Sequence, residues 1–275
     1  MTRLARATDG TALLGDDTGF VPLRAAMPAC STVEEALAVA ARGDLPTVDE
    51  TPATPVVEEN LQFSAPLAEF GKLWGIGLNY ADHAADLNEE RPANPASFMK
   101  PATAVTGPGG PIRLPSRDLT DRVTAEAELG VVIGRECRDV SVDAADTVVA
   151  GYVPIIDMTA EDILERNPRY LTRAKSFDSF IVVGPWLRTT DEVESLDEMT
   201  VETVVNGDVV AENTVRNMMT QPAELVSFHS RVMTLRPGDV ISTGTPGAHV
   251  ITPGDTVRAA VEDVGTLSAE VVQGR

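Results

Sequence analysis

The chain has 275 residues, of which 42 are acidic and 22 are basic, and its formal net charge is −20. Such an acidic surface repels nucleic acid and anionic membrane surfaces, so we expect neither as a partner. The length allows one large domain or a small and a large one, and the absence of an apolar run of about 18 residues and of a charged-then-apolar leader predicts a cytoplasmic protein without a membrane span.

Residues 1–65 predict a small α+β lobe followed by a linker. The segment E-E-A-L-A-V-A-A-R has the composition of a helix, and Ser31 and Thr32 before it are candidates for its N-cap. A stretch rich in proline, threonine and glutamate then runs from Leu45 to Glu59, which is typical of a linker.

Residues 66–275 predict a larger, strand-rich domain. Apolar segments bounded by glycine and proline read as strands: L-W-G-I-G, E-L-G-V-V-I, V-V-A-G-Y-V, F-I-V-V-G and V-I-S-T-G. Asn206-Gly207 is the dipeptide preferred in a type I′ turn, so V-E-T-V-V-N-G-D-V-V predicts a hairpin. We expect helices at roughly 79–90, 158–167 and 221–234, and hence a strand-rich α+β fold.

Two kinds of site are disfavoured by the spacing of glycine and cysteine. Gly75 and Gly77 follow a predicted strand, but no third glycine and no alternation of strands and helices follow, so a dinucleotide site is not expected. Cys30 and Cys137 lack a C-x-x-C spacing, and we expect free thiols rather than a disulfide or a zinc site.

Three carboxylates in apolar surroundings are the most informative feature of the chain. Glu126 and Glu128 are two residues apart in A-E-A-E-L-G-V-V-I, so on a strand they project from the same face, and Asp157 follows a second apolar run. Carboxylates brought together resist ionising unless a cation lies between them, and an all-oxygen site suits Mg²⁺, Mn²⁺ or Ca²⁺ rather than Zn²⁺. The alternative is that the two glutamates form the solvated face of an edge strand.

The three histidines have different surroundings. His83 precedes Asp86 by three residues, so on a helix the carboxylate would orient the imidazole as in a general base with its partner, although a helix-surface pair without function has the same spacing. His229 lies in an amphipathic segment, where a helix-surface or a satisfied core histidine is expected. His249 follows a glycine-rich turn, and we do not expect it to face a pocket.

Six motifs together resemble the fumarylacetoacetate hydrolase family, in the order found there. They extend over roughly residues 70 to 270. The motifs are G-x-N-Y-x-x-H, P-x-S-F-M-K-P, E-x-E-L, G-Y-x-x-x-x-D-M-T-A, A-K-S-F-D-S-F with G-P, and P-G-D-V-I-S-T-G-T-P-G.

The resemblance implies a mixed β-roll or β-sandwich core and a Mg²⁺ or Mn²⁺ ion, with Ca²⁺ as a substitute, held by Glu126, Glu128 and Asp157. It also implies a 2-oxo acid substrate and assembly into a homodimer or a larger oligomer. For catalysis it assigns His83 as base, Asp86 as its orienter, and Lys175. For substrate contact it assigns Lys100, Gly244, Thr245 and the position of Glu161.

The chain departs from the family pattern at two positions. Asp86 stands where members usually have glutamate, and Glu161 stands where they commonly have an arginine after D-M-T-A. Glu161 therefore reverses a charge that would pair with an anionic group of the substrate. Three arginines that follow are candidates to replace the missing charge: Arg166, Arg169 and Arg173.

Three functions remain open at this point. The first is a metal-dependent hydrolase that cleaves a C–C bond in a β-diketo acid of the acylpyruvate type. The second is a dehydratase of 2-keto-3-deoxy sugar acids, or an isomerase or decarboxylase, on the same site. The third is a metal-binding relative that Glu161 has made inactive.

Overall fold

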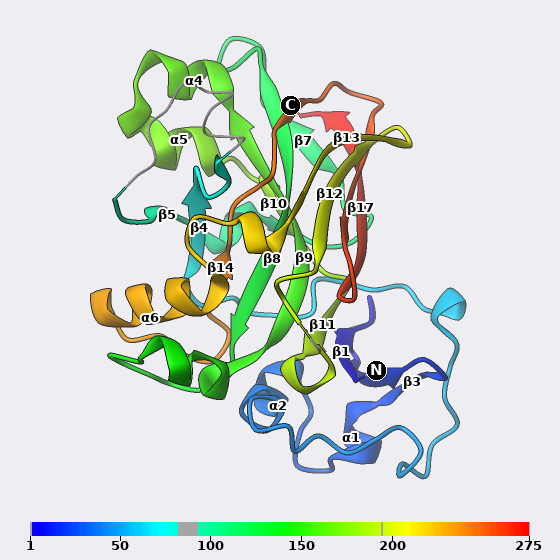
Figure 1. Cartoon of the computed structure of the whole chain (residues 1–275). Helices are drawn as coiled ribbons and strands as arrows, with labels where there is room; N and C mark the ends of the chain where they lie inside the picture. Colours follow the sequence, from blue (N-terminus) through cyan, green and yellow to red (C-terminus); the bar gives the residue numbers. More distant parts are fainter. Residues whose placement is uncertain (1, 82–92, 194, 275) are drawn as a thin grey trace.

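The computed structural model describes residues 2–81, 93–193 and 195–274, and its strands form two sheets that pack against each other (Figure 1). Within these residues twelve strands form the central sheet, with the main order β3-β2-β1-β11-β9-β8-β14-β4-β5. Its strands are β1 (Arg3–Arg6), β2 (Ala12–Asp16), β3 (Gly19–Pro22), β4 (Leu73–Gly77), β5 (Ala96–Lys100), β6 (Val105–Thr106), β8 (Val123–Ile133), β9 (Val149–Ala160), β10 (Ile181–Val183), β11 (Trp186–Thr189), β14 (Val240–Ser242) and β15 (His249–Val250).

The second sheet has the order β13-β12-β16-β17-β7 among the described residues and covers one face of β8 and β9. Its strands are β7 (Ile112–Leu114), β12 (Thr200–Val205), β13 (Asp208–Thr214), β16 (Thr256–Val261) and β17 (Gly265–Gln273). The α-helices are α1 (Leu23–Ala26), α2 (Val33–Ala40), α4 (Glu161–Arg166), α5 (Leu171–Lys175) and α6 (Pro222–Val232). Short 3₁₀ turns lie at Glu58–Asn60, Ala102–Ala104, Val142–Val148, Pro168–Tyr170, Thr190–Glu192 and Val215–Asn217. The strand-rich α+β fold class is confirmed.

The long antiparallel pair β8 and β9 forms the centre of the molecule, and every residue of both strands is buried. Ala125, Ala127 and Leu129 on one face of β8 belong to the large apolar core that the second sheet completes. The alternate residues of β8 point to the opposite face. Polar side chains on that opposite face are therefore enclosed by the fold, and the candidate site lies there.

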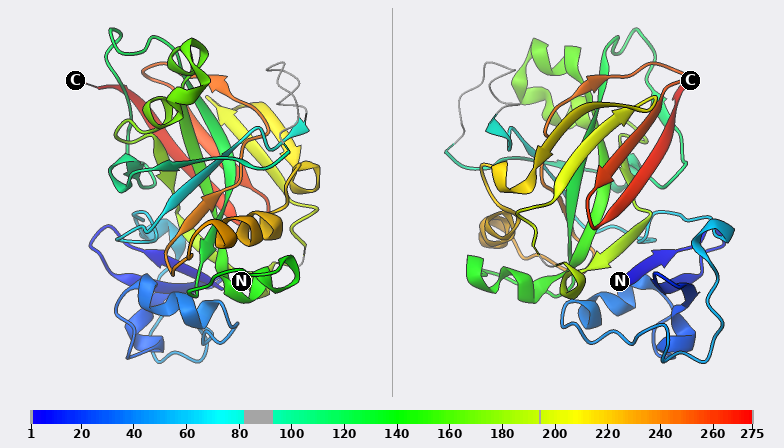
Figure 2. Two further views of the ribbon diagram at one scale, coloured as in Figure 1. Left: turned by 90° about the vertical axis from the view of Figure 1, so that its left-hand side faces the viewer. Right: turned by 45° about the vertical axis from the view of Figure 1, so that its right-hand side comes forward.

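The N-terminal lobe lies at one end of the long strands, and α4 and α5 lie at the other (Figure 2). Strand β1 pairs antiparallel with β11, so the strands of the lobe continue the central sheet. Helix α2 begins as predicted, because the Thr32 side chain accepts a hydrogen bond from the Glu35 backbone NH while the Glu35 carboxylate accepts one from Thr32. The division of the chain at residue 65 stays a prediction.

Two of the local predictions are confirmed, and one is partly wrong. Asn206 and Gly207 both have positive φ between β12 and β13, as the predicted hairpin turn requires, and α6 lies within the helix expected at 221–234. The helix expected from residue 158 begins only at Glu161, because 158–160 continue the β9 ladder opposite β8. Most of the helix expected at 79–90 lies outside the described residues.

No helix in the described part of the chain has the length and apolar character needed to cross a membrane.

Candidate metal centre

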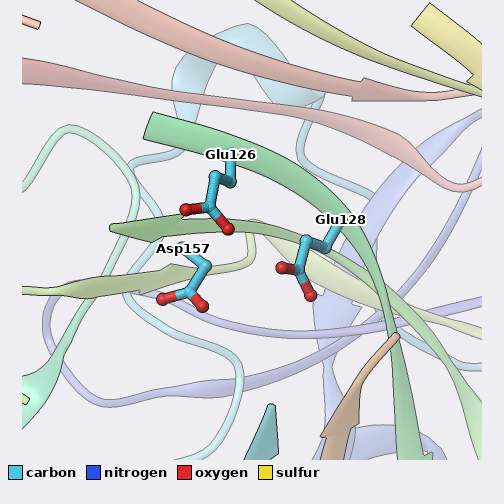
Figure 3. Close-up of side chains that lie close together, drawn as sticks. All are labelled: Glu126, Glu128 and Asp157. Atoms are coloured by element: carbon cyan, nitrogen blue, oxygen red, sulfur yellow. The ribbon is translucent and has the colours of Figure 1, made fainter. Parts of the chain in front are cut away.

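Glu126, Glu128 and Asp157 converge on one point in the interior (Figure 3). Glu126 and Glu128 lie on the same face of β8, and Asp157 on β9 is the direct cross-strand partner of Glu126. One oxygen from each of the three lies within 4.8 Å of the others, and none of the side chains is more than 6% exposed. The edge-strand alternative is wrong, because β8 lies inside the central sheet.

Two lysines approach this carboxylate cluster. The Lys175 ammonium lies 2.8 Å from Glu126 Oε2 and 3.0 Å from Asp157 Oδ2, and it therefore bridges the two strands. The Lys100 ammonium lies 2.5 Å from Asp157 Oδ1 and donates to the Phe180 carbonyl at 2.8 Å. Three carboxylates against two ammonium groups leave one net negative charge in a buried site.

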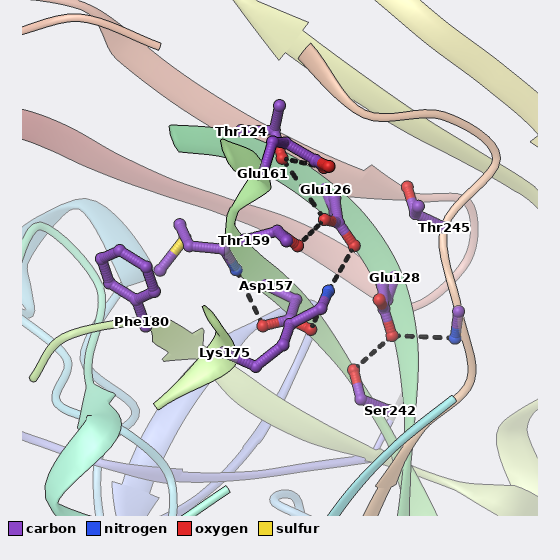
Figure 4. A network of polar contacts seen from close by, with 12 residues as sticks. Thr124, Glu126, Glu128, Asp157, Thr159, Glu161, Lys175, Phe180, Ser242 and Thr245 are labelled. Atoms are coloured by element: carbon purple, nitrogen blue, oxygen red, sulfur yellow. Dashed lines mark hydrogen bonds and ion pairs between the residues drawn. The ribbon is translucent and has the colours of Figure 1, made fainter. Parts of the chain in front are cut away.

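Short hydrogen bonds fix the orientation of the carboxylates (Figure 4). Glu128 Oε2 accepts from Ser242 Oγ at 2.6 Å and from the Gly244 backbone NH at 2.8 Å. The Thr159 hydroxyl donates to Glu126 Oε1. Groups that hold ligands in this way raise the affinity and selectivity of metal sites, because the ligands need no reorganisation on binding.

The pKa of Glu128 reflects the uncompensated negative charge of the cluster. Burial, followed by the nearby charge of Asp157, raises this pKa from 4.5 to about 8. Burial by itself would lower the pKa of Lys175, but Asp157 and Glu126 outweigh it and raise that pKa. In the absence of a further cation, Glu128 is thus mostly protonated at neutral pH, and this proton balances the charge that a divalent cation would otherwise balance.

The cluster fits a divalent cation. All three candidate ligands are carboxylate oxygens, which suit Mg²⁺, Mn²⁺ and Ca²⁺, and their burial excludes the water that would otherwise compensate the charge. A divalent cation would replace the proton on Glu128 and remove the negative excess. The Lys100 and Lys175 ammonium groups would remain beside the ligands.

The cluster opens at one end into a cavity of about 480 Å³. Of the predicted site residues, Glu126, Glu161, Lys175 and Thr245 line this cavity. Lys100 was expected to line the pocket, but in the structure it lies behind Asp157, with its ammonium enclosed by backbone carbonyls, and is not part of the lining. Lys100 therefore contributes charge to the cluster without facing the cavity.

Gly244 was expected to contact the substrate, and in the structure its NH is already bonded to Glu128. Its φ of +97° favours glycine, and a Cβ there would lie 2.8 Å from Asn79 Cβ and 2.9 Å from the Ile76 carbonyl. Gly244 is not part of the cavity lining either. Its role in the described structure is to bring the chain close enough to hold Glu128.

Comparison with known proteins identifies the family. The sequence profile described as fumarylacetoacetate (FAA) hydrolase C-terminal matches residues 72–272. The chain belongs to the fumarylacetoacetate hydrolase family. The expected fold family is thereby confirmed, and the match covers the whole of β8 and β9.

Three relatives indicate the range of activities in this family. The chain is 35% identical over 250 residues to the 2,4-didehydro-3-deoxy-L-rhamnonate hydrolase of Sphingomonas sp. (strain SKA58), a match that covers 88% of this chain and 85% of that protein. The structure of 5-carboxymethyl-2-hydroxymuconate delta-isomerase from Mycobacterium smegmatis is 32% identical, with a TM-score of 0.78 and 99% coverage of both chains. The structure of maleylpyruvate hydrolase from Sphingobium sp. SYK-6 with manganese(II) and pyruvate is 27% identical, with a TM-score of 0.81 and coverage of 99% of this chain and 100% of that one.

These relatives are hydrolases and an isomerase, so the family includes enzymes of both kinds. Membership by itself does not select one of these reactions for this chain. The manganese-containing relative and the buried carboxylates of this chain together support a divalent metal.

Glu161 lies at the side of the cavity in this family member. Its Oε1 accepts a hydrogen bond from Thr124 Oγ1 at 3.0 Å, and burial, followed by the charge of Glu126, raises its pKa. The arginines proposed to replace a missing positive charge are not part of the described lining, and Arg166 pairs instead with Asp162 at 2.5 Å. The replacement hypothesis therefore finds no support in the described lining.

The described histidines lie away from the cavity lining. His83 and Asp86 lie outside the described residues, so their assignment as base and orienter stays a prediction. His229 is a satisfied core residue, with Nδ1 2.7 Å from the Leu225 carbonyl and Nε2 2.8 Å from Ser97 Oγ. His249 is exposed on β15 and does not line the cavity.

Three residues of the site were missed by the sequence analysis: Thr124, Thr159 and Ser242. Thr124 precedes Glu126 by two residues and Thr159 follows Asp157 by two, so the same-face rule that found the glutamates would have found both. Ser242 lies on a separate strand, and no local pattern connects it with Glu128. Cys30 and Cys137 are free thiols, as predicted.

Proposed function

We propose that this protein is a divalent-metal-dependent hydrolase that cleaves the C–C bond between the carbonyl groups of a 2,4-dioxo acid. The observation that carries the proposal is the buried cluster of Glu126, Glu128 and Asp157 at the end of a cavity that Lys175 also lines. With a divalent cation bound, such an end would be complementary to the vicinal carboxylate and carbonyl oxygens of a 2-oxo acid.

The bound metal would act as a Lewis acid toward the oxygens of this head group and favour enolate formation. Lys175 carries a positive charge at the same end of the cavity, where it would stabilise the negative charge that develops next to the head group. The Thr245 side chain lines the cavity, and its hydroxyl donates to the Gly247 carbonyl at 2.8 Å. Thr245 therefore shapes the cavity wall beside the head group.

The reaction consumes one water molecule. Its oxygen forms a bond to the C4 carbonyl carbon, the C3–C4 bond breaks, and C3 takes up a proton, so the products are pyruvate or a substituted pyruvate and the carboxylate of the acyl fragment. The predicted base for the water is His83, oriented by Asp86. A general base of this kind contributes on the order of 10²–10⁴ to the rate.

The names of two relatives support this choice. Both the rhamnonate-derived substrate and maleylpyruvate are named as substrates of hydrolases, and both names describe acids that carry 2-oxo and 4-oxo groups. Both relatives align with more than four fifths of the chain.

Isomerisation of a 2-hydroxydienoate is the second candidate, favoured by the 32% identity to the muconate isomerase. It needs the same enolate stabilisation but no water attack. The identity of the product therefore separates the two candidates.

The test is proton NMR of metal-stripped protein with acetylpyruvate, before and after addition of Mn²⁺ or Mg²⁺. We expect pyruvate and acetate to appear only with metal. Exchange or migration of protons without a fragment would favour isomerisation, and no change with any 2,4-dioxo acid would contradict the proposal. Glu126→Gln should abolish the reaction, and the matched Glu270→Gln variant, at an exposed position on β17, should retain it.

A further inference from the structure

The described lining of the cavity carries no free cation away from the carboxylate cluster. The apolar side chains of this lining include Leu164, Leu171 and Phe98, and its ionisable groups away from the cluster are Glu161 and Glu165. Lys175 is the one cationic residue in the described lining, and its ammonium already contacts two carboxylates. A second carboxylate on a substrate tail would therefore find no counter-charge among these residues.

The charge of the site points the same way. The cluster with its two lysines has one negative charge in excess, a divalent cation converts this to one positive charge, and an ionised Glu161 carboxylate offsets that charge. A single head-group carboxylate then leaves the site with one negative charge. A tail carboxylate would add a further negative charge that no cation of the described lining balances, in a partly enclosed cavity where Coulomb repulsion is stronger than in water.

Glu161 is the acidic residue of the described lining, away from the cluster, that has no ion-pair partner among the described residues. Glu165 forms an ion pair with Arg122, whereas the described residues place no cation within ion-pair distance of Glu161. Thr124 donates a hydrogen bond to the Glu161 carboxylate and so orients it. Because Glu161 lines the same cavity as Glu126 of the cluster, a substrate tail in this cavity would lie beside the Glu161 carboxylate.

We propose that this protein selects 2-oxo acids with a single carboxylate and an uncharged acyl tail, and that Glu161 is the residue that excludes dicarboxylates. The inference rests on the proposed function for its head-group site. The inference concerns the tail of the substrate rather than the reaction. It sets this chain apart from relatives whose names denote diacid substrates.

The test is isothermal titration of Mn²⁺-loaded protein with two acids of equal chain length, 2-oxohexanoate and 2-oxoadipate. We expect the wild type to bind 2-oxohexanoate at least about tenfold more tightly. Glu161→Gln should reduce this ratio at least about threefold, and Glu161→Arg should reverse the preference. Glu270→Gln should leave the ratio unchanged, and circular dichroism checks that each variant is folded.

Equal or tighter binding of 2-oxoadipate by the wild type, or an unchanged ratio in folded Glu161→Gln, would overturn the inference. Failure of both acids to bind would overturn the head-group site and this inference with it. If the protein prefers 2-oxohexanoate as expected but cleaves no 2,4-dioxo acid, the inference is supported and only the proposed reaction is overturned.

Discussion

Glu126 and Asp157 are direct partners across the antiparallel ladder of β8 and β9, and the Lys175 ammonium contacts both. Like charges directly opposite each other destabilise a sheet, and burial strengthens the effect. The fold therefore holds a repulsive pair that only cations can neutralise. Lys175 and Lys100 supply two positive charges beside this pair, and a divalent metal would balance the remaining charge of Glu128.

Removal of the Glu128 carboxylate should separate metal binding from folding. We expect Glu128→Gln to weaken Mn²⁺ binding at least about a hundredfold, because one anionic ligand is lost. Since the folded pKa of about 8 lies above the unfolded value, wild-type Glu128 contributes stability at acid pH that is lost as the pH rises toward 8. Metal-free Glu128→Gln should thus become more stable relative to wild type over this range. Titration calorimetry and urea unfolding measure the two effects, and equal Mn²⁺ affinity would contradict the assignment.

Loss of the Lys175 charge should affect binding and turnover in opposite directions. Lys175→Met removes a cation that competes with the metal for Glu126 and Asp157, so Mn²⁺ should bind at least about tenfold more tightly. Turnover should fall by about 10²–10³, because a positive charge beside the developing enolate is lost. If both affinity and turnover fell together, Lys175 would be a structural residue only. Mn²⁺ titration followed by electron paramagnetic resonance gives the affinity.

The Ser242 hydroxyl should strengthen metal binding by orienting the Glu128 carboxylate. Ser242→Ala removes the 2.6 Å hydrogen bond to Glu128 Oε2 but leaves the bond from the Gly244 NH. We expect Mn²⁺ affinity to decrease by about 10–100-fold. Ser268→Ala, at an exposed position of β17, is the matched control and should bind Mn²⁺ as the wild type does.

Asn79 connects two loops beside the site. Its side-chain amide donates to the carbonyls of Thr220 and Thr243, at 3.0 and 2.7 Å, and accepts from the Thr220 NH at 2.9 Å. Asn79→Ala leaves these buried groups without partners and should lower the free energy of unfolding by about 2–4 kcal/mol. Asn79→Asp keeps the acceptor but loses both donated bonds, so it should also be destabilised. Denaturant unfolding of both variants measures the loss of stability. A variant as stable as the wild type would contradict the stabilising role of Asn79.

His229 should make the protein less stable in acid. Burial lowers its pKa, so the unfolded chain takes up a proton at a higher pH than the folded chain. The stabilising contribution is complete above the unfolded pKa of about 6.5 and is lost as the pH falls, by at most about 1.4 kcal/mol per pH unit. The stability difference between wild type and His229→Gln should therefore shrink below pH 6.5. His249→Gln, at an exposed histidine, should retain the wild-type trend.

Local spacing was sufficient to find the candidate metal ligands. Glu126 and Glu128 share a face because side chains alternate along a strand, and the same rule applies to Thr124 and Thr159, which we missed. The hairpin turn at Asn206-Gly207 and the cap at Thr32 were also predictable, since both depend on the conformational preferences and hydrogen bonds of neighbouring residues. The strand that continues to Ala160 was not, because its pairing with Val123 overrides the local helix signal.

The sequence by itself determined the strand-rich fold class, the family resemblance and the three carboxylates, because these reside in short motifs and regular alternation. Only the tertiary structure placed Lys100 behind Asp157, brought Ser242 to Glu128 and left Glu161 without a paired cation among the described residues. Each of these contacts joins residues far apart in the chain. Their distances, and hence the charge balance that defines the site, depend on how the strands pack rather than on any local pattern.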